Sequence, residues 1–327
     1  MHPDSARELK ARILEQLPSA PVSASDAGTD VPWPFVAVGL TPGGAAGARV
    51  AVRLQREGDR ALLPDLGRAA AEQVDVRVIG PVRALRSPTP AELQARVRPL
   101  RPGLSVAHPA VTAGTLGGFV RTAGGPALLS NNHVIAASDA AAVGDAVLQP
   151  GPADGGTVAD RVATLTGFER FVEGGRNLVD AAVALLDPGV RAEPGGLPGG
   201  PLGGEVVSAT DVDPDEAVEK VGRTTGHTRG VVTAVEVDAV AVQYDDVVHR
   251  FDDQIEIQGQ TGGFSAGGDS GSVIWRSRDR APMALLFAGS STGGAGGSGV
   301  TFANPLATVL QVLGARWWAD PEPFTAR

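Results

Sequence analysis

Cysteine is absent from the 327 residues of the chain, and long apolar runs are absent as well. The first absence excludes a disulfide framework and any thiolate or zinc–thiolate chemistry. The second argues against a membrane-spanning helix, which needs roughly 18 consecutive apolar residues. The chain also starts without the basic and apolar regions of a signal peptide. We therefore expect a cytoplasmic protein without a membrane span.

Aromatic side chains and clustered positive charges are also scarce. Aromatic residues make up 4% of the sequence, whereas glycine occurs 44 times, a composition typical of a turn-rich β protein. The formal net charge is −9. A nucleic-acid partner is therefore not expected, because phosphate binding requires concentrated lysine and arginine.

Residues 1–85 are predicted to form an N-terminal helix followed by a small α+β module. Leu9, Ile13 and Leu14 recur at helical spacing, and Pro18 ends this helix. Beyond it are two strand-like runs, a helical run and a third strand, at residues 35–40, 48–54, 63–73 and 74–82. The module holds no cluster of catalytic residue types. We interpret it as a surface for homo-oligomerisation or for a regulatory partner.

Residues 86–109 are rich in proline and arginine, which is typical of a linker. In the rest of the chain short β runs alternate with glycine-rich turns, which favours a barrel or a sandwich over a parallel sheet. The predicted strands cover residues 115–121, 126–131, 157–165, 178–186, 230–237, 239–244, 251–258, 271–275 and 283–288. A final helix is predicted for residues 305–315, where Leu306, Val309 and Leu310 share one face.

Three short strings carry residue types that together can perform acyl transfer. Each combines a short apolar β run with one polar residue of the required kind. They are Leu128–Ile135 with His133, Asn177–Leu186 with Asp180, and Gly267–Ile274 with Ser270.

The chemistry explains why these residue types belong together. A serine hydroxyl is a poor nucleophile near neutral pH and needs an adjacent base, for which histidine has a suitable pKa. A carboxylate bound to the other imidazole nitrogen fixes the tautomer and stabilises the imidazolium. The tetrahedral oxyanion needs two fixed donors, which the backbone N–H groups of Gly268 and Ser270 could supply. His133, Asp180 and Ser270 are therefore the predicted catalytic residues.

Each string also has a simpler interpretation when it is taken alone. A histidine in an apolar context is commonly a core or turn residue, and an aspartate in a β run can guard a strand edge. A Gly-Asp-Ser-Gly turn can arise by chance in a glycine-rich chain. The three strings nevertheless occur together and in the order His, Asp, Ser, which favours the catalytic interpretation.

The three strings resemble the signature of chymotrypsin-fold (trypsin-like) serine proteases, through Ser130–His133, Asp180 and Gly268–Gly271. Val221–Gly230 is similar to the start of barrel two in bacterial members such as the streptogrisins. Gly299–Pro305 is similar to their closing segment. The lack of cysteine and of a signal peptide resembles instead the trypsin-like proteins grouped with plant Narrow Leaf.

This resemblance implies a mainly β fold with two six-stranded antiparallel β-barrels and a C-terminal helix. The protease domain would cover residues 110–327, with barrel one at about 110–195 and barrel two at about 215–304. The implied activity is hydrolysis of peptide bonds in a protein or peptide substrate through an acyl-enzyme intermediate, with no cofactor.

Two departures from the family pattern accompany the resemblance. The family usually places a serine beside the catalytic aspartate, whereas this sequence aligns Ala288 or Ser290 with that position. In zymogen-type members, activation cleavage creates a new N-terminus. This terminus pairs with the aspartate that aligns with Asp269. No activation cleavage site is visible here, so Asp269 needs another partner.

The resemblance also implies a primary specificity pocket. Phe264 aligns with its base and Ser265 follows, while Gly289, Ser290 and Gly299 align with its walls. None of these residues carries a carboxylate. We therefore expect a modest apolar substrate side chain such as Leu, Val or Met rather than Lys or Arg.

Two other functions stay open at this point. One is a protease-fold binding or scaffold protein with little turnover, which the complete His/Asp/Ser set disfavours. The other is an acyl hydrolase that uses the same triad on non-peptidic substrates. No metal site is predicted, because the remaining histidines lack a second ligand at metal spacing.

Overall fold

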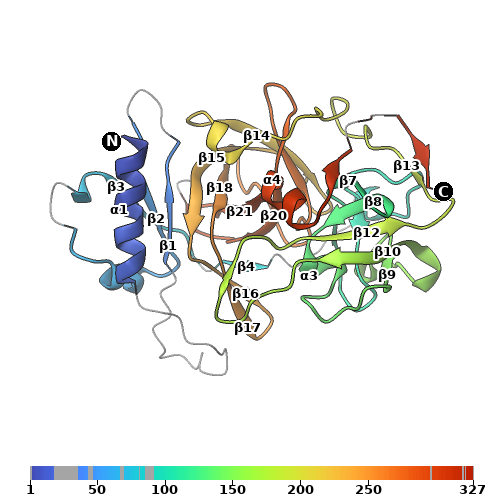
Figure 1. Ribbon diagram of the computed structural model, residues 1–327, viewed down its shortest axis with the longest axis horizontal. Helices are drawn as coiled ribbons and strands as arrows, with labels where there is room; N and C mark the ends of the chain where they lie inside the picture. Colours follow the sequence, from blue (N-terminus) through green and yellow to red (C-terminus); the bar gives the residue numbers. More distant parts are fainter. Residues whose placement is uncertain are drawn as a thin grey trace.

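The computed structural model describes residues 2–17, 36–42, 47–66, 70–80, 82–84, 92–294, 297–318, 320 and 322–326. The chain is mainly β, and its units follow one another along the long axis of the molecule (Figure 1). The N-terminal unit lies at one end, one β-barrel lies in the middle, and the other β-barrel lies at the far end near the C-terminus. No helix in this described part combines the length and the apolar character that a membrane crossing needs.

Barrel one is a six-stranded antiparallel sheet with the strand order β22-β7-β8-β12-β10-β9. Its strands are β7 (Gly118–Thr122), β8 (Gly125–Ser130), β9 (Ala146–Leu148), β10 (Arg161–Phe168), β12 (Ala182–Leu186) and β22 (Arg316–Trp317). A short antiparallel pair, β5 (Ser105–Val106) with β6 (Gly114–Thr115), is linked to β9 by a bridge between Ala107 and Leu148. Phe119, Leu128 and Leu165 are fully buried in its core, because alternate residues of a strand face inward.

Barrel two closes on itself through six antiparallel pairings. β14 pairs with β15, β15 with β18, β18 with β21, β21 with β20, β20 with β19, and β19 again with β14. Its strands are β14 (Ala217–Gly222), β15 (Gly226–Asp238), β18 (Gln254–Gly259), β19 (Val273–Arg276), β20 (Pro282–Gly289) and β21 (Thr301–Pro305). A hairpin of β16 (Val240–Tyr244) and β17 (Val247–Phe251) lies between β15 and β18 in sequence. The helix α4 (Leu306–Val312) follows β21, so the expected two-barrel fold with a C-terminal helix is confirmed.

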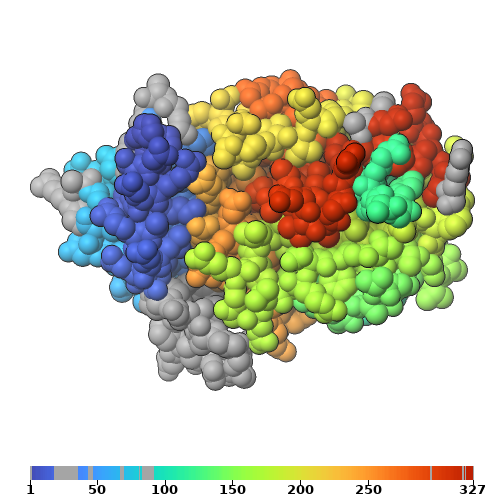
Figure 2. Space-filling view, in the orientation of Figure 1, coloured from blue at the N-terminus to red at the C-terminus, as the bar shows by residue number. Residues whose placement is uncertain are grey.

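The N-terminal unit packs one helix on a three-stranded sheet. The helix α1 (Pro3–Gln16) buries Leu9 and Ile13 against β1 (Val36–Leu40), β2 (Val50–Leu54) and β3 (Val74–Val78). β1 is antiparallel to β2, and β2 is parallel to β3. β1 also pairs with β15, so the sheet of this unit continues the sheet of barrel two. Figure 2 shows the two units in direct contact.

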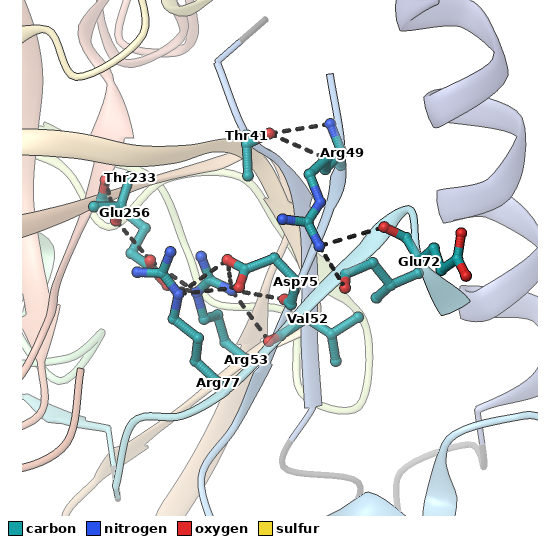
Figure 3. A network of polar contacts seen from close by, with 10 residues as sticks. Thr41, Arg49, Val52, Arg53, Glu72, Asp75, Arg77, Thr233 and Glu256 are labelled. Atoms are coloured by element: carbon teal, nitrogen blue, oxygen red, sulfur yellow. Dashed lines mark hydrogen bonds and ion pairs between the residues drawn. The ribbon is translucent and has the colours of Figure 1, made fainter. Parts of the chain in front are cut away.

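A buried ion pair stabilises the contact between the N-terminal unit and barrel two. Arg53 of β2 and Glu256 of β18 are 0% and 1% exposed, and Arg53 Nε lies 2.7 Å from Glu256 Oε2. Asp75 and Thr233 add further contacts to this network (Figure 3). A buried guanidinium is stable only when it is paired in this way. The N-terminal unit is therefore held on barrel two by charge as well as by strand pairing.

Several local expectations need correction. The helical run expected at 63–73 is wrong at its start, because a 3-10 helix covers Glu57–Leu62 and residues 63–66 are not helical, whereas residues 70–71 are helical and residues 67–69 lie outside the described residues. Pro64 lacks a backbone N–H and disfavours a helical residue before it. The strand expected from 178 begins only at Ala182.

The segment expected as a linker is only partly described. Residues 86–91 lie outside the described residues. Within the remainder, Glu92–Gln94 form a 3-10 helix, and β5 pairs with β6.

Candidate active site

The three predicted catalytic residues lie on three segments that meet between the barrels. His133 lies in the short helix α3 (Asn132–Ile135), directly after β8. Asp180 lies in the segment before β12, and Ser270 lies in the turn before β19 of barrel two. The carbonyl of Ser270 accepts a hydrogen bond of 2.7 Å from the N–H of Thr115, which places the Ser270 turn on barrel one.

His133 and Asp180 form a direct pair. The imidazole Nδ1 lies 2.5 Å from Asp180 Oδ2, and the backbone N–H of His133 donates to Asp180 Oδ1 over 3.2 Å. The Asp180 side chain is fully buried and that of His133 is 10% exposed. Because Nδ1 is engaged, Nε2 is the nitrogen that can exchange a proton with a nucleophile.

Asparagine side chains hold the segments around this pair. Asn131 Nδ2 donates to the carbonyl of Asp180 over 2.6 Å, and the N–H of Asp180 donates to Asn304 Oδ1 over 3.0 Å. Asn132 Nδ2 donates to the carbonyl of Glu169 over 2.7 Å. The two asparagines before the histidine are thus explained, since each fixes a neighbouring backbone segment through a buried amide.

Ser270 lies close to the histidine segment. A Cβ on Gly114 would lie 2.4 Å from Val134 Cγ2 and 3.0 Å from the carbonyl oxygen of Ser270, so a glycine is needed where these segments meet. Ser270 Oγ lies 3.4 Å from the carbonyl oxygen of Phe287. The buried His133 Nε2 has no hydrogen-bond partner within the described residues. The hydrogen bond between Ser270 and His133 is therefore not formed here, as often occurs in the absence of substrate.

Side-chain hydroxyls orient the peptide groups of the two predicted oxyanion donors. Within the part of the chain that is described, neither the Gly268 N–H nor the Ser270 N–H donates a hydrogen bond. Thr224 Oγ1 donates to the carbonyl of the residue before Gly268 over 2.5 Å, and Ser272 Oγ donates to the carbonyl of the residue before Ser270 over 2.6 Å. In a trans peptide the N–H points away from the C=O, so each hydroxyl sets the direction of one donor. Gly268 has a φ of 90°, which glycine adopts without strain.

Lys220 supplies the partner that Asp269 needs. Lys220 Nζ lies 3.1 Å from Asp269 Oδ2, and both side chains are fully buried. The same carboxylate accepts hydrogen bonds from Thr224 N (2.8 Å), Thr225 Oγ1 (2.7 Å) and Ala266 N (3.0 Å). Burial lowers the pKa of Lys220, and the Asp269 carboxylate opposes this effect.

The hydroxyl beside Asp180 comes from an unexpected strand. Ala288 has no hydroxyl, and Ser290 Oγ donates to the carbonyl of Thr292 over 3.0 Å. Tyr244, the last residue of β16, instead donates its phenol hydroxyl to Asp180 Oδ2 over 2.7 Å. Sequence reasoning missed this contact, although Tyr244 is the single tyrosine of the chain.

Most of the predicted pocket residues lie together. Ser265 Oγ is 2.6 Å from Thr301 Oγ1, and a Cβ on Gly289 would lie 3.6 Å from Ser265 Oγ. A Cβ on Gly299 would lie 1.9 Å from the carbonyl oxygen of Ser290. These residues form a cluster of small side chains at the end of β20.

Phe264 has different surroundings. Its side chain is 2% exposed and packs in the core of barrel two with Val232 and Ile257. Its ring centroid lies 5.6 Å from Lys220 Nζ. A role of Phe264 at the base of the pocket stays a prediction.

Beside His133 and Tyr244 there is a cavity of about 380 Å³. The cavity is also lined by residues of the segments 110–113 and 137–140 and by Asp245. This volume falls within the range of small-ligand sites. The cavity therefore offers space for a small group next to the imidazole.

The strand edge next to Ser270 is occupied by the chain itself. The short strand β4 (Arg83–Ala84) pairs antiparallel with Ala288 and Gly289 of β20, and its other edge pairs parallel with β16. The residue before Ala288 is Phe287, whose carbonyl lies beside Ser270 Oγ. The short strand β4 thus lies along the end of β20 that is next to Ser270.

The remaining histidines near acidic residues form simple pairs. His227 Nε2 lies 2.5 Å from Glu219 Oε2, and His108 Nε2 lies 3.2 Å from Asp145 Oδ2. Among the described residues no group of three or more histidine, aspartate or glutamate side chains is arranged to hold a metal ion.

Among known proteins, similarity to this chain is found only with solved structures. No family model and no curated protein matches the sequence. A glutamic acid-specific serine protease that uses a histidine triad in substrate binding is 18% identical with a TM-score of 0.47, covering 67% of this chain and 100% of its own. Cellulomonas bogoriensis chymotrypsin is 18% identical with a TM-score of 0.45, covering 68% and 100%. Thermobifida fusca protease A is 15% identical with a TM-score of 0.44, also covering 68% and 100%.

The first of these structures is described as a serine protease, the second as a chymotrypsin and the third as a protease. We assign the chemistry of the site from its own geometry.

Proposed function

We propose that the chain is a serine endopeptidase in which Ser270 is the nucleophile, His133 the general base and Asp180 the carboxylate that orients the base. The contact of 2.5 Å between His133 Nδ1 and Asp180 Oδ2 carries this proposal. A purely structural pair would not need to leave the buried Nε2 without a hydrogen bond, which costs free energy. An unbonded imidazole nitrogen close to a serine turn is what general-base catalysis requires.

The proposed reaction has two stages. Ser270 Oγ attacks the scissile carbonyl carbon while its proton passes to His133 Nε2, and Asp180 stabilises the resulting imidazolium. The N–H groups of Gly268 and Ser270 donate to the oxyanion. The proton then moves from Nε2 to the leaving amine, the C–N bond breaks, and an acyl-enzyme remains. A water molecule that loses a proton to His133 hydrolyses this ester and restores the Ser270 hydroxyl.

We also propose a preference for modest apolar side chains before the cleaved bond. Ser265, Gly289 and Gly299 contribute only small groups to the cluster at the end of β20. Asp252 is not available to a basic substrate side chain there, because it accepts from the Ala239 N–H and pairs with Arg176 and Arg250. Profiling of cleavage sites in a denatured peptide library tests this preference, and a dominant preference for Arg or Lys would overturn it.

Turnover of a fluorogenic peptide library tests the endopeptidase function. The wild type is expected to cleave peptides, and Ser270→Ala is expected to lose this activity while it keeps its melting temperature. Ser5→Ala, which removes an exposed hydroxyl on α1, is the matched control and should be fully active. A parallel assay with simple esters separates the two remaining functions. Ester turnover without peptide turnover would indicate a non-peptidic acyl hydrolase, and no turnover of either would indicate a binding protein.

A further inference from the structure

The Oδ2 atom of Asp180 has two hydrogen-bond donors. One is His133 Nδ1 at 2.5 Å and the other is the hydroxyl of Tyr244 at 2.7 Å. The other carboxylate oxygen, Oδ1, receives the backbone N–H of His133 at 3.2 Å. The phenol therefore binds the same oxygen atom that orients the imidazole.

The surroundings of Tyr244 leave its hydroxyl little freedom. Its backbone is paired with Val247 across the β16–β17 hairpin, and its side chain is buried. Its ring centroid lies 5.0 Å from that of Phe171, 5.7 Å from that of His249 and 5.5 Å from that of His133. A rigid aromatic ring with one buried hydroxyl needs a fixed partner, and Asp180 is that partner.

The hydroxyl keeps its proton at every pH at which an endopeptidase works. Burial, together with the nearby charge of Asp180, raises the pKa of Tyr244 well above its ordinary value. Tyr244 is therefore a neutral donor to a carboxylate, which is a stronger contact than a bond between two neutral groups.

We propose that Tyr244 is a positioning residue for the triad, which holds Asp180 Oδ2 in place and draws part of its negative charge away from His133. This inference rests on the proposed function and adds a fourth side chain to it. The family pattern places a serine beside the aspartate, whereas here a tyrosine from the β16–β17 hairpin takes this place. Tyr244 acts through Asp180 and need not touch the reacting atoms.

The proposal predicts a specific change in pH dependence. Without the phenol, Asp180 keeps more charge density for the imidazolium, so the protonated form of His133 becomes more stable and its pKa rises. The acidic limb of the kcat/KM profile should then move to higher pH. The other ionisable groups around this position include Asp180 itself, His249 on β17, and Asp139 and Glu173, which act on His249. Asp245 lines the cavity beside Tyr244. Tyr244→Phe leaves all of them in place.

The test compares Tyr244→Phe with the wild type and with Phe171→Leu, which alters the same aromatic cluster without touching the hydroxyl. For Tyr244→Phe we expect kcat to fall about tenfold, KM to change by less than about twofold, and the acidic limb to rise by about half a pH unit. Phe171→Leu should lower the melting temperature without moving that limb. An unchanged limb and an unchanged kcat in Tyr244→Phe would overturn the proposal.

A second measurement applies if Tyr244→Phe turns over too slowly for a pH profile of kcat/KM. The pKa of His133 is followed by NMR in Ser270→Ala, with and without Tyr244→Phe. A rise of this pKa in the double variant supports the proposal, and an unchanged or lower pKa contradicts it. An inactive wild type would refute the proposed function instead, so the two failures are distinguishable.

Discussion

Lys220 Nζ and Asp269 Oδ2 lie 3.1 Å apart in the interior of barrel two, directly beneath the turn that carries Ser270. Both side chains are fully buried, so neither charge can be stabilised by water. The residues that Asp269 binds, Thr224, Thr225 and Ala266, frame the turn on both sides. The ion pair therefore fixes the conformation in which Ser270 is presented.

Lys220→Met should destabilise the protein by about 3–5 kcal/mol, because it leaves the Asp269 carboxylate buried without a cation. Peptide turnover should fall as well, since the turn loses its main support. The only other lysine of the chain, Lys10 on α1, pairs with Asp238 at the end of β15 at 2.7 Å and provides the matched control Lys10→Met. Urea unfolding and peptide assays on both variants decide the matter. A stable and fully active Lys220→Met would show that the pair is dispensable.

The sequence allowed most local elements to be predicted and the three residues of the candidate site to be selected, because each has a short-range signal. Alternation and glycine-rich turns marked most strands, and His133, Asp180 and Ser270 stand in recognisable strings. Helical spacing placed the start of the run at 63 incorrectly, because Leu63 and Leu66 pack on the N-terminal core while Pro64 disfavours a helical residue before it.

The supporting residues could not be predicted in the same way. Tyr244 and Asp180 are far apart in sequence, and their contact exists only because the β16–β17 hairpin of barrel two approaches barrel one. Lys220 stands in an ordinary β run, and only the closure of barrel two brings it under Asp269. Contacts of this kind depend on tertiary structure and leave no periodic pattern in the sequence.

Thr224→Val tests the fixation of the oxyanion donors. The variant keeps the shape of the side chain but removes the hydroxyl that holds the carbonyl before Gly268. We expect kcat to fall about tenfold with a nearly unchanged KM, less than the loss of an entire oxyanion donor. The control is Thr228→Val, which removes a similar bond of 2.8 Å to the carbonyl of Phe264. Equal effects of the two variants would argue against a special role of Thr224.

Proline substitutions test whether β4 restricts the site. A peptide that pairs with β20 next to Ser270 has to displace β4 from Ala288 and Gly289. The double variant Arg83→Pro and Ala84→Pro removes two backbone donors from β4 and should raise kcat/KM severalfold, because more molecules have a free edge. Thr325→Pro in the equally short strand β23 (Phe324–Thr325) is the control. An unchanged or lower kcat/KM in the double variant would show that β4 does not compete with substrate.

The acid sensitivity of the protein should depend in part on His249. Burial lowers the pKa of His249 in the folded protein below the ordinary value of 6.5. The unfolded chain therefore takes up the proton first as the pH falls, so the stabilisation is complete above about pH 6.5 and is lost as the pH falls through the folded pKa. Melting temperatures between pH 7.5 and 4.5 should decrease more steeply for the wild type than for His249→Gln. Parallel curves for the two proteins would contradict this linkage.

The most direct test of the central claim is the mass and position of a covalent fluorophosphonate adduct. A hydroxyl activated by His133 and Asp180 should react once per chain, and peptide mapping should place the adduct on Ser270. His133→Ala should abolish the reaction, because the triad acts as a unit. An adduct on another serine, or an adduct on Ser270 that survives His133→Ala, would contradict the account.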